Sequence, residues 1–289
     1  MTAEPETDPD ELRAAARERW ERAADGWQRS NERFQAAAMP VSQWLIDAID
    51  AQPGQRVLEL AAGVGETGFL AAELIAPGGG TLISSDGADA MLAHARARAE
   101  QLGLTNVEFK QLELEWIDLP AASVDAVLCR WGYMLVVDKA AALRETRRVL
   151  KPGGRLALAA WSTPERVTFA AIPRKALVEA GLVDGFNIAA GPGMFDLADP
   201  DALRALLEET GFADATVEEL PITLCYDGVE DLIASTRELA PAFADVVDPL
   251  DERQRADLVA RLTAATAPFA APDGSLALPA VALGATAEA

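Results

Sequence analysis

The chain has 289 residues, half of them apolar and a quarter charged, which is enough apolar material for a globular protein with a sizeable core. It carries 46 acidic side chains against 25 lysines and arginines, a formal net charge of −21. Because the phosphates of nucleic acids and anionic lipids repel such a surface, we expect no nucleic acid and no membrane as partner.

The N-terminal residues and the number of cysteines indicate the subcellular location of the protein. The first ten residues are acidic and rich in turn-forming residues, without the basic and apolar regions of a signal peptide. No stretch approaches the roughly 18 continuous apolar residues that a membrane span needs. Cys129 and Cys225 are the only cysteines, too few for a disulfide framework or a zinc site. These features predict a cytoplasmic protein.

A long helix is expected over about residues 8–38, which are rich in Ala, Arg and Glu. Trp20, Trp27 and Phe34 recur every seven residues and therefore share one face. Two interpretations stay open: this stripe packs on the body of the protein, or part of it closes over a ligand. Asp25-Gly26 interrupts the helical pattern and would let the second half of the helix turn.

From residue 56 onward, strand, turn and helix alternate. This spacing predicts a parallel sheet with right-handed crossover connections. The expected strands span 56–60, 81–84, 107–110, 124–129 and 155–161, and the expected helices span 67–75, 88–102 and 139–150.

After residue 161 the regular alternation ends. Asp199-Pro200 forms an N-cap followed by proline at the first helical position, and Gly211 lies just beyond the other end of that helix. Other segments expected to be regular are a helix over 169–180, a strand over 216–226, mostly helical structure over 228–267 and a last strand within 275–287.

Three glycines follow the first strand. Gly63, Gly65 and Gly68 spell G-x-G-x-x-G between a strand and a helix, which is also the fingerprint of dinucleotide-binding folds. Glu59 lies four residues before the first glycine, where its carboxylate would repel a pyrophosphate. The same carboxylate suits the ammonium, sulfonium and hydroxyl groups of S-adenosylmethionine, which carries no phosphate. The motif therefore favours S-adenosylmethionine.

Acidic residues also follow the next two strands. Asp86 ends the second strand, where it can accept hydrogen bonds from both ribose hydroxyls; the alternative is a cap for the next helix. Glu113 follows the third strand and can accept from the adenine amino group; the alternative is a solvated loop acid. The ligand of a doubly wound sheet lies at the carboxyl ends of its strands, so three acids at three such ends form one expected site.

These residues carry a family resemblance. The segment 57–65, Val-Leu-Glu-Leu-Ala-Ala-Gly-Val-Gly, resembles motif I of the class I methyltransferases, in the variant with Ala61 that is common among relatives of the UbiE-type quinone C-methyltransferases. Segments 113–120 and 123–132 resemble the next motifs, and 150–156 is similar to the family's turn before the fifth strand. Glu59 and Glu113 stand where aspartate is usual, so their reach differs by one methylene. The resemblance covers about residues 40–161 well and 199–226 weakly.

The resemblance implies a doubly wound α/β, Rossmann-like methyltransferase fold: a seven-stranded, mostly parallel sheet, with an antiparallel last strand and a helical cap. Residues 1–50 would form an N-terminal helical cap segment, and 51–289 the methyltransferase domain with cap insertions at about 162–198 and 228–270. The expected cofactor is S-adenosyl-L-methionine. The expected cofactor-binding residues are Glu59, Ala61, Gly63, Gly65, Asp86, Gly87, Met91, Glu113, Leu114, Cys129 and Arg130.

The end of the fourth strand suggests how catalysis would work. His94, the only histidine, lies in the middle of a helix, and Cys129-Arg-Trp-Gly132 offers no carboxylate pair for a divalent metal, so we expect no metal. Arg130 and Tyr133 are the candidate catalytic residues. Arg130 would stabilise a phenolate or carboxylate acceptor, or pair with a neighbouring acid; Tyr133 would act there or only pack. The expected substrate-binding residues are Trp161, Phe186 and Phe195.

The expected function is transfer of a methyl group from S-adenosylmethionine to oxygen or carbon of a small, largely apolar or aromatic metabolite. The partner would be this small-molecule acceptor alone, bound by a monomer or homodimer. Two alternatives stay open: a nicotinamide-dependent oxidoreductase, and a cofactor-binding protein of this fold that transfers no methyl group.

Overall fold

A central sheet organises the computed structural model, which describes residues 8–185 and 191–289 except for the side chain of Asn31. Within these residues the sheet has seven strands in the order β3-β2-β1-β4-β5-β7-β6. β1 to β5 are parallel, and β7 pairs antiparallel with both β5 and β6. This confirms the predicted fold class. The strands are β1 (Arg56–Glu59), β2 (Thr81–Asp86), β3 (Val107–Gln111), β4 (Val124–Arg130), β5 (Leu150–Trp161), β6 (Ala213–Tyr226) and β7 (Leu276–Glu288).

The strand order reverses between β1 and β4, so the chain leaves these neighbouring strands in opposite directions. In doubly wound sheets the ligand crevice lies at the carboxyl ends of the strands beside such a switch. Four strands end there on a residue of the predicted site: β1 on Glu59, β2 on Asp86, β4 on Arg130 and β5 on Trp161.

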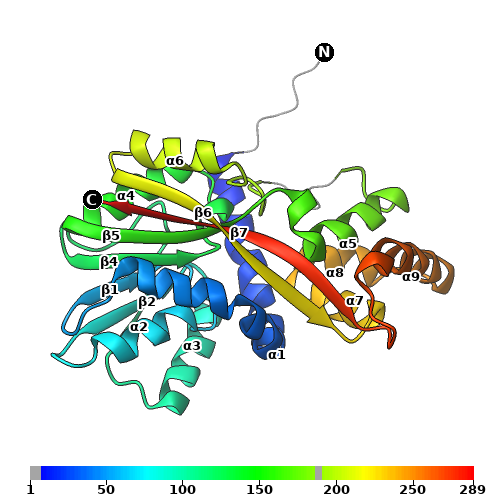
Figure 1. Ribbon diagram of the computed structural model, residues 1–289, viewed down its shortest axis with the longest axis horizontal. Helices are drawn as coiled ribbons and strands as arrows, with labels where there is room; N and C mark the ends of the chain where they lie inside the picture. Colours follow the sequence, from blue (N-terminus) through cyan, green and yellow to red (C-terminus); the bar gives the residue numbers. More distant parts are fainter. Residues whose placement is uncertain (1–7, 186–190) are drawn as a thin grey trace.

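The α-helices that follow β1, β2 and β4 and the helix that precedes β6 all pack on strands of this sheet (Figure 1). The side chain of Asp199 accepts from the backbone N–H groups of Asp201 and Ala202, which gives α6 the predicted cap. The bounds agree with the expected helices to within one residue. They are α2 (Thr67–Ile75), α3 (Asp89–Leu102), α4 (Lys139–Val149) and α6 (Pro200–Glu209).

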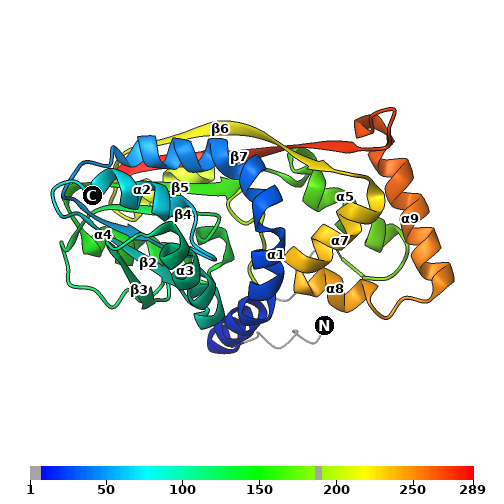
Figure 2. The ribbon, with the colours of Figure 1, turned by 90° about the horizontal axis from the view of Figure 1, so that it is seen from below.

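The N-terminal helix α1 (Pro9–Ile49) is one 41-residue helix, longer than expected. Figure 2 shows its second half lying along the sheet and its first half turning away between the sheet and the helices α7 and α8. Pro40 lies inside the helix, and proline removes a backbone hydrogen bond and bends a helix. The helix is continuous through Asp25-Gly26, where the sequence pattern suggested an interruption. A Cβ on Gly26 would lie 2.2 Å from the carbonyl oxygen of Glu238, so this glycine lets α1 approach the end of α7 closely.

The segments after β5 and β6 form a helical cap at one end of the molecule (Figure 1). β6 and β7 continue beyond the other strands as a two-stranded ribbon that reaches this cap. The cap has its own apolar cluster of Ala176, Leu177, Ile233, Phe243, Val247, Leu258 and Leu262. Its helices are α5 (Thr168–Glu179), α7 (Val229–Leu239), α8 (Pro241–Val247) and α9 (Glu252–Thr266). None of the helices in the described part of the chain is both long and apolar enough to span a membrane.

Candidate functional site

The turn between β1 and α2 takes a conformation that favours glycine. Gly63 and Gly65 have φ values of 58° and 75°. A Cβ on Gly65 would lie 2.4 Å from the ring of Phe69, whereas a Cβ on Gly63 would meet no atom within 4 Å. Ala61 also has a positive φ, 51°, despite its side chain. The turn is therefore packed against α2 at Gly65 and open at Gly63, where a ligand can approach the backbone.

Glu59 is buried beneath this turn rather than facing its open side. Its carboxylate accepts hydrogen bonds from the backbone N–H of Gly68 at 2.7 Å and from Ser84 Oγ at 3.2 Å. A Cβ on Gly68 would lie 2.2 Å from Glu59 Oε2, so the third glycine makes room for this carboxylate. Burial raises the pKa of Glu59 to about 7. Glu59 thus fixes the start of α2, and its contact with a cofactor stays a prediction.

Asp86 joins the end of β2 to the glycine turn. One carboxylate oxygen accepts from the backbone N–H of Gly63 and the other from that of Ala88, both at 2.9 Å. Burial raises its pKa to about 6, against the opposing effect of these two hydrogen bonds. Each oxygen retains a lone pair, so the observed contacts are compatible with both predicted uses, at the start of α3 and toward ribose hydroxyls.

Beyond Asp86 the site has an acidic rim and an apolar wall. Glu113 is exposed, and its carboxylate lies against Gly87, where a Cβ would be 3.2 Å from Glu113 Oε2. Leu114 and Met91 are buried, and Met91 packs with Val64 of the glycine turn. Acids beside an apolar wall can accept hydrogen bonds from a ribose and adenine while the wall contacts the base.

The first half of α1 forms a roof over this rim. Arg17 pairs with Glu113 at 3.0 Å, and Arg13 pairs with Glu115 at 2.8 Å. The carboxylate of Glu21 accepts from the backbone N–H groups of Asp89 and Ala90 at 2.7 and 3.0 Å, where a negative charge suits the start of α3.

These residues fit S-adenosylmethionine. Its ribose and adenine are uncharged, and the acids at the ends of β2 and β3 match hydroxyl and amino donors. The two arginines of α1 that reach this rim are already paired with carboxylates there. The same carboxylates would repel the pyrophosphate of a dinucleotide.

Arg130, at the end of β4, is the centre of a polar cluster with Glu66, Gln35 and Ser42, which we call the Arg130 cluster. One guanidinium nitrogen donates to Glu66 Oε2 at 2.6 Å, and another donates to Gln35 Oε1 at 3.1 Å and Ser42 Oγ at 2.8 Å. The Glu66 and Arg130 side chains are only 6% and 11% exposed. Of the two roles expected for Arg130, pairing with a neighbouring acid is the one observed.

An aromatic wall stands beside the Arg130 cluster. The rings of Trp131 and Trp161 stack with centroids 4.3 Å apart, and the Arg130 guanidinium lies 5.0 Å from the Trp131 ring centroid. Phe34 packs edge-on against Trp131, and Phe169 of α5 against Trp161. The tryptophan–phenylalanine stripe of α1 therefore continues into the strand ends.

The remaining predicted residues lie in different surroundings. The Tyr133 hydroxyl bonds to Thr146 of α4, and burial raises its pKa well above the ordinary value, so its observed contact is the packing alternative. Cys129 is fully buried in β4, and burial raises the pKa of its thiol to about 12. Phe195 packs on the main core, and Phe186 lies outside the described residues.

Three residues of this site escaped the sequence analysis: Gln35, Ser42 and Glu66. Glu66 follows Gly65 directly, so its place in the glycine turn was a usable signal. Gln35 and Ser42 lie 95 and 88 positions from Arg130, and nothing in the local sequence indicates that contact.

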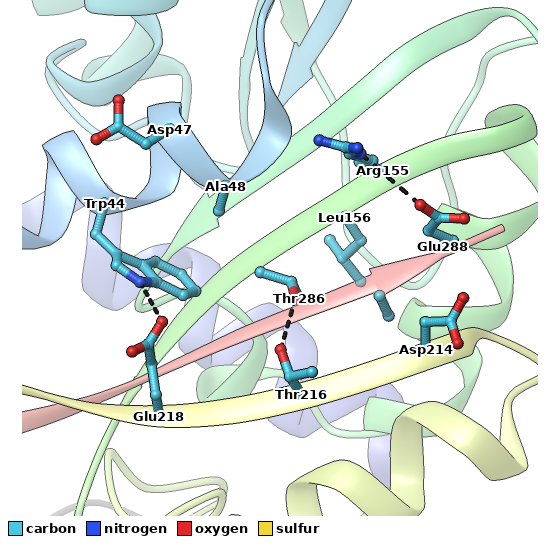
Figure 3. A pocket seen from close by; sticks show the side chains of 11 residues that line it. Trp44, Asp47, Ala48, Arg155, Leu156, Asp214, Thr216, Glu218, Thr286 and Glu288 are labelled. Carbon is cyan, nitrogen blue, oxygen red and sulfur yellow. Dashed lines mark hydrogen bonds and ion pairs between the residues drawn. The ribbon is translucent and has the colours of Figure 1, made fainter.

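A separate cavity of about 430 Å³ is lined by residues of α1, β5, β6 and β7, among them Trp44 and Arg155 (Figure 3). Trp44 Nε1 donates to Glu218 there, and Arg155 pairs with Glu288. It shares no residue with the Arg130 cluster or the glycine turn. Among the described residues, no three His, Cys, Asp or Glu side chains are placed to hold a metal ion.

Comparison with known proteins places this geometry in a family. A family model described as a methyltransferase domain matches residues 51–185. Ubiquinone/menaquinone biosynthesis C-methyltransferases UbiE from Citrobacter koseri and Escherichia coli are each 30% identical over 180 residues, which cover 59% of this chain and 71% of the relative.

Solved structures show the same fold. The YcgJ protein of Bacillus subtilis has a TM-score of 0.57 at 19% identity, over 86% of this chain and 98% of that one. A putative methyltransferase from Bacillus halodurans scores 0.54 at 19% identity, over 86% and 97%. The [4+2]-cyclase SpnF scores 0.53 at 18% identity, over 88% and 82%. These structures show the fold, and the sequence relatives show the family. The chain belongs to the class I methyltransferases related to UbiE, and it is a methyltransferase whose cofactor is S-adenosylmethionine.

Proposed function

We propose that this enzyme methylates oxygen or carbon of a small, largely apolar aromatic acceptor without a metal ion. The observation that carries this proposal is the aromatic wall of Trp131 and Trp161 at the ends of β4 and β5. Buried aromatic side chains with a few polar groups are typical of sites for small apolar ligands. The relatives' printed name, a quinone-biosynthesis C-methyltransferase, supports a ring as the acceptor.

Each part of the site has one task in this proposal. Asp86 and Glu113 would hold the ribose and adenine of the cofactor, which supplies an electrophilic methyl group on a sulfonium. The aromatic wall would hold the acceptor ring at the ends of β4 and β5. The roof formed by α1 would exclude water from both. Holding two reactants in line supplies several kcal/mol of the barrier by itself, so the reaction does not require a metal.

The test is methyl transfer from labelled S-adenosylmethionine to a panel of naphthols, hydroquinones, primary amines and aliphatic acids, with and without chelator. We expect labelling of the phenolic ring compounds, at oxygen or ring carbon, and no loss of rate in chelator. Calorimetry should give micromolar binding of S-adenosylhomocysteine and none of NAD. Labelling confined to amines or aliphatic acids, or a rate abolished by chelator, would contradict the proposal.

A pair of tryptophan variants separates acceptor binding from the fold. Trp161→Ala removes part of the aromatic wall and should raise the acceptor KM while leaving S-adenosylhomocysteine affinity unchanged. Trp44→Ala, in the separate cavity of Figure 3, is the matched control and should change neither. Equal effects of the two substitutions on KM would place the acceptor elsewhere.

A further inference from the structure

Buried polar atoms without a hydrogen-bond partner gather in and beside the Arg130 cluster. Five such side-chain atoms occur in the described part of the chain, and three of them are Gln35 Nε2, Glu66 Oε1 and Trp131 Nε1. Gln35 and Glu66 each use their other polar atom to bind Arg130, and the Trp131 ring lies against the same guanidinium. Leaving a buried polar atom without a hydrogen bond is unfavourable and uncommon, so three such atoms around one side chain point to a ligand.

The chemistry of these three atoms defines what that ligand offers. The amide nitrogen of Gln35 and the indole nitrogen of Trp131 are donors, and Glu66 Oε1 is an acceptor. The charge of Arg130 is already balanced by Glu66 at 2.6 Å, so the cluster as a whole is neutral. A hydroxyl group on an aromatic ring satisfies this set, because its oxygen accepts and its O–H donates.

We propose that Glu66 is the catalytic base: Glu66 Oε1 takes the proton of an acceptor hydroxyl while Gln35 and Trp131 donate hydrogen bonds to the same oxygen. This inference rests on the proposed function and narrows it to phenolic acceptors. It also supplies a proton acceptor, which the sequence analysis did not find.

The surroundings of Glu66 suit a base. Burial raises its pKa above the ordinary glutamate value, and Arg130 and Arg98 oppose this rise. The buried carboxylate of Glu59 is the other charged group that interacts with it. A general base is most effective when its pKa lies near the working pH, and burial shifts the pKa of this carboxylate upward, toward neutral pH.

The proposed step balances in atoms and charge. The hydroxyl O–H bond breaks and its proton passes to Glu66, while the acceptor oxygen, or a ring carbon made nucleophilic by that oxygen, forms a bond to the methyl carbon. The S–CH₃ bond of the cofactor breaks and its electron pair stays on sulfur. Methylation at carbon ends with loss of the ring proton from that carbon to water. After methylation at oxygen, Glu66 releases its proton to solvent; after methylation at carbon, Glu66 returns it to the ring oxygen, so one proton is released in either case.

The competing role for Glu66 is to hold the ammonium group of the cofactor, because it follows the glycine turn directly. The observed contacts of Glu66 favour a role toward the methyl acceptor. Glu66 reaches Arg130 at the end of β4, and the Arg130 guanidinium lies against the rings of Phe34 and Trp131, 6.0 and 5.0 Å from their centroids. The two roles predict different effects on cofactor affinity when the carboxylate is removed.

Glu66→Gln is the test, because it keeps the shape and removes the base. We expect kcat for weakly acidic phenols to fall by roughly 10²-fold or more, with S-adenosylhomocysteine affinity by calorimetry unchanged. The loss should shrink for nitrophenols, which ionise without help. The acid limb of the wild-type pH profile, set by deprotonation of Glu66, should disappear. Glu73→Gln, exposed on α2, which begins directly after Glu66, is the control and should behave as wild type.

The outcomes separate the inference from the proposed function. No methylation of any ring acceptor by the wild-type enzyme overturns both. Suppose that the wild-type enzyme methylates ring acceptors. If Glu66→Gln then loses the same factor in kcat for weakly and strongly acidic phenols, or keeps the acid limb of its pH profile, only the catalytic base is overturned. Weakened S-adenosylhomocysteine binding in Glu66→Gln assigns the carboxylate to the cofactor and also overturns it. If the variant fails to fold, the wild-type enzyme decides: an acid limb that appears with weakly acidic phenols and is absent with nitrophenols supports the base, and the same limb with both overturns it.

Discussion

Arg130 and Glu66 are 64 positions apart in the sequence, yet their side chains meet at 2.6 Å with exposures of only 11% and 6%. This pair joins the end of β4 to the start of α2 and brings Gln35 and Ser42 of α1 to the same point. It therefore fixes where the roof helix sits over the strand ends.

Arg130→Met should lower the free energy of unfolding by about 3–5 kcal/mol, because it leaves the buried Glu66 carboxylate without its counter-charge. Urea denaturation measures this. Arg166→Met, which removes an exposed pair with Glu219, is the control and should leave stability nearly unchanged. Similar losses in both variants would mean that the Arg130 pair is no more important than a surface contact.

Asp86→Ala should weaken S-adenosylhomocysteine binding by about 1.5–3 kcal/mol, the usual cost of losing a hydrogen bond to a charged group. Calorimetry measures it, with circular dichroism to check the fold. Asp89→Ala, three positions along and 70% exposed at its side chain, should bind as wild type. Unchanged affinity in Asp86→Ala would restrict Asp86 to joining the glycine turn and α3.

Stability should fall as pH rises from about 5 to 8. The pKa of Glu59 is raised to about 7 and that of Asp86 to about 6, so the folded state binds more protons than the unfolded chain over this range. The stability that these groups contribute is complete at acid pH and is lost as pH rises through the folded values. Urea denaturation at several pH values should show this slope, and Glu59→Gln should reduce it. A slope of the opposite sign, or one unaffected by Glu59→Gln, would contradict the assignment.

Gly26→Ala should destabilise the protein by about 1–3 kcal/mol, although alanine is the better helix former, because its Cβ would collide with the carbonyl of Glu238. In Gly185→Ala, at a bend after α5, the new Cβ would meet no atom of the described residues within 4 Å, and this variant is the control. Thermal unfolding compares them. A stabilised Gly26→Ala protein would show that α1 and α7 do not approach so closely.

Local patterns predicted most elements because their causes are local. Apolar runs of strand length separated by glycine turns indicated the parallel strands, and the Asp199-Pro200 cap located the start of α6. At Gly26 the same reasoning failed. A glycine inside a helix usually indicates weakness, but here it permits contact with a helix more than 200 positions away, which no local pattern encodes.

The same difference between local and long-range causes applies to the candidate site. The class of fold, the glycine turn and the acids at the strand ends could be predicted from motif spacing, because that spacing alone places these residues at one edge of a sheet. What each side chain faces could not be predicted, because it follows from the folding of the whole chain. That folding turned Glu59 inward to Gly68, paired Arg130 with Glu66, bonded Tyr133 to Thr146, and brought α1 across the strand ends. These outcomes depend on burial and on partners distant in sequence, and burial decides whether a charged side chain meets a ligand, a counter-ion or the backbone.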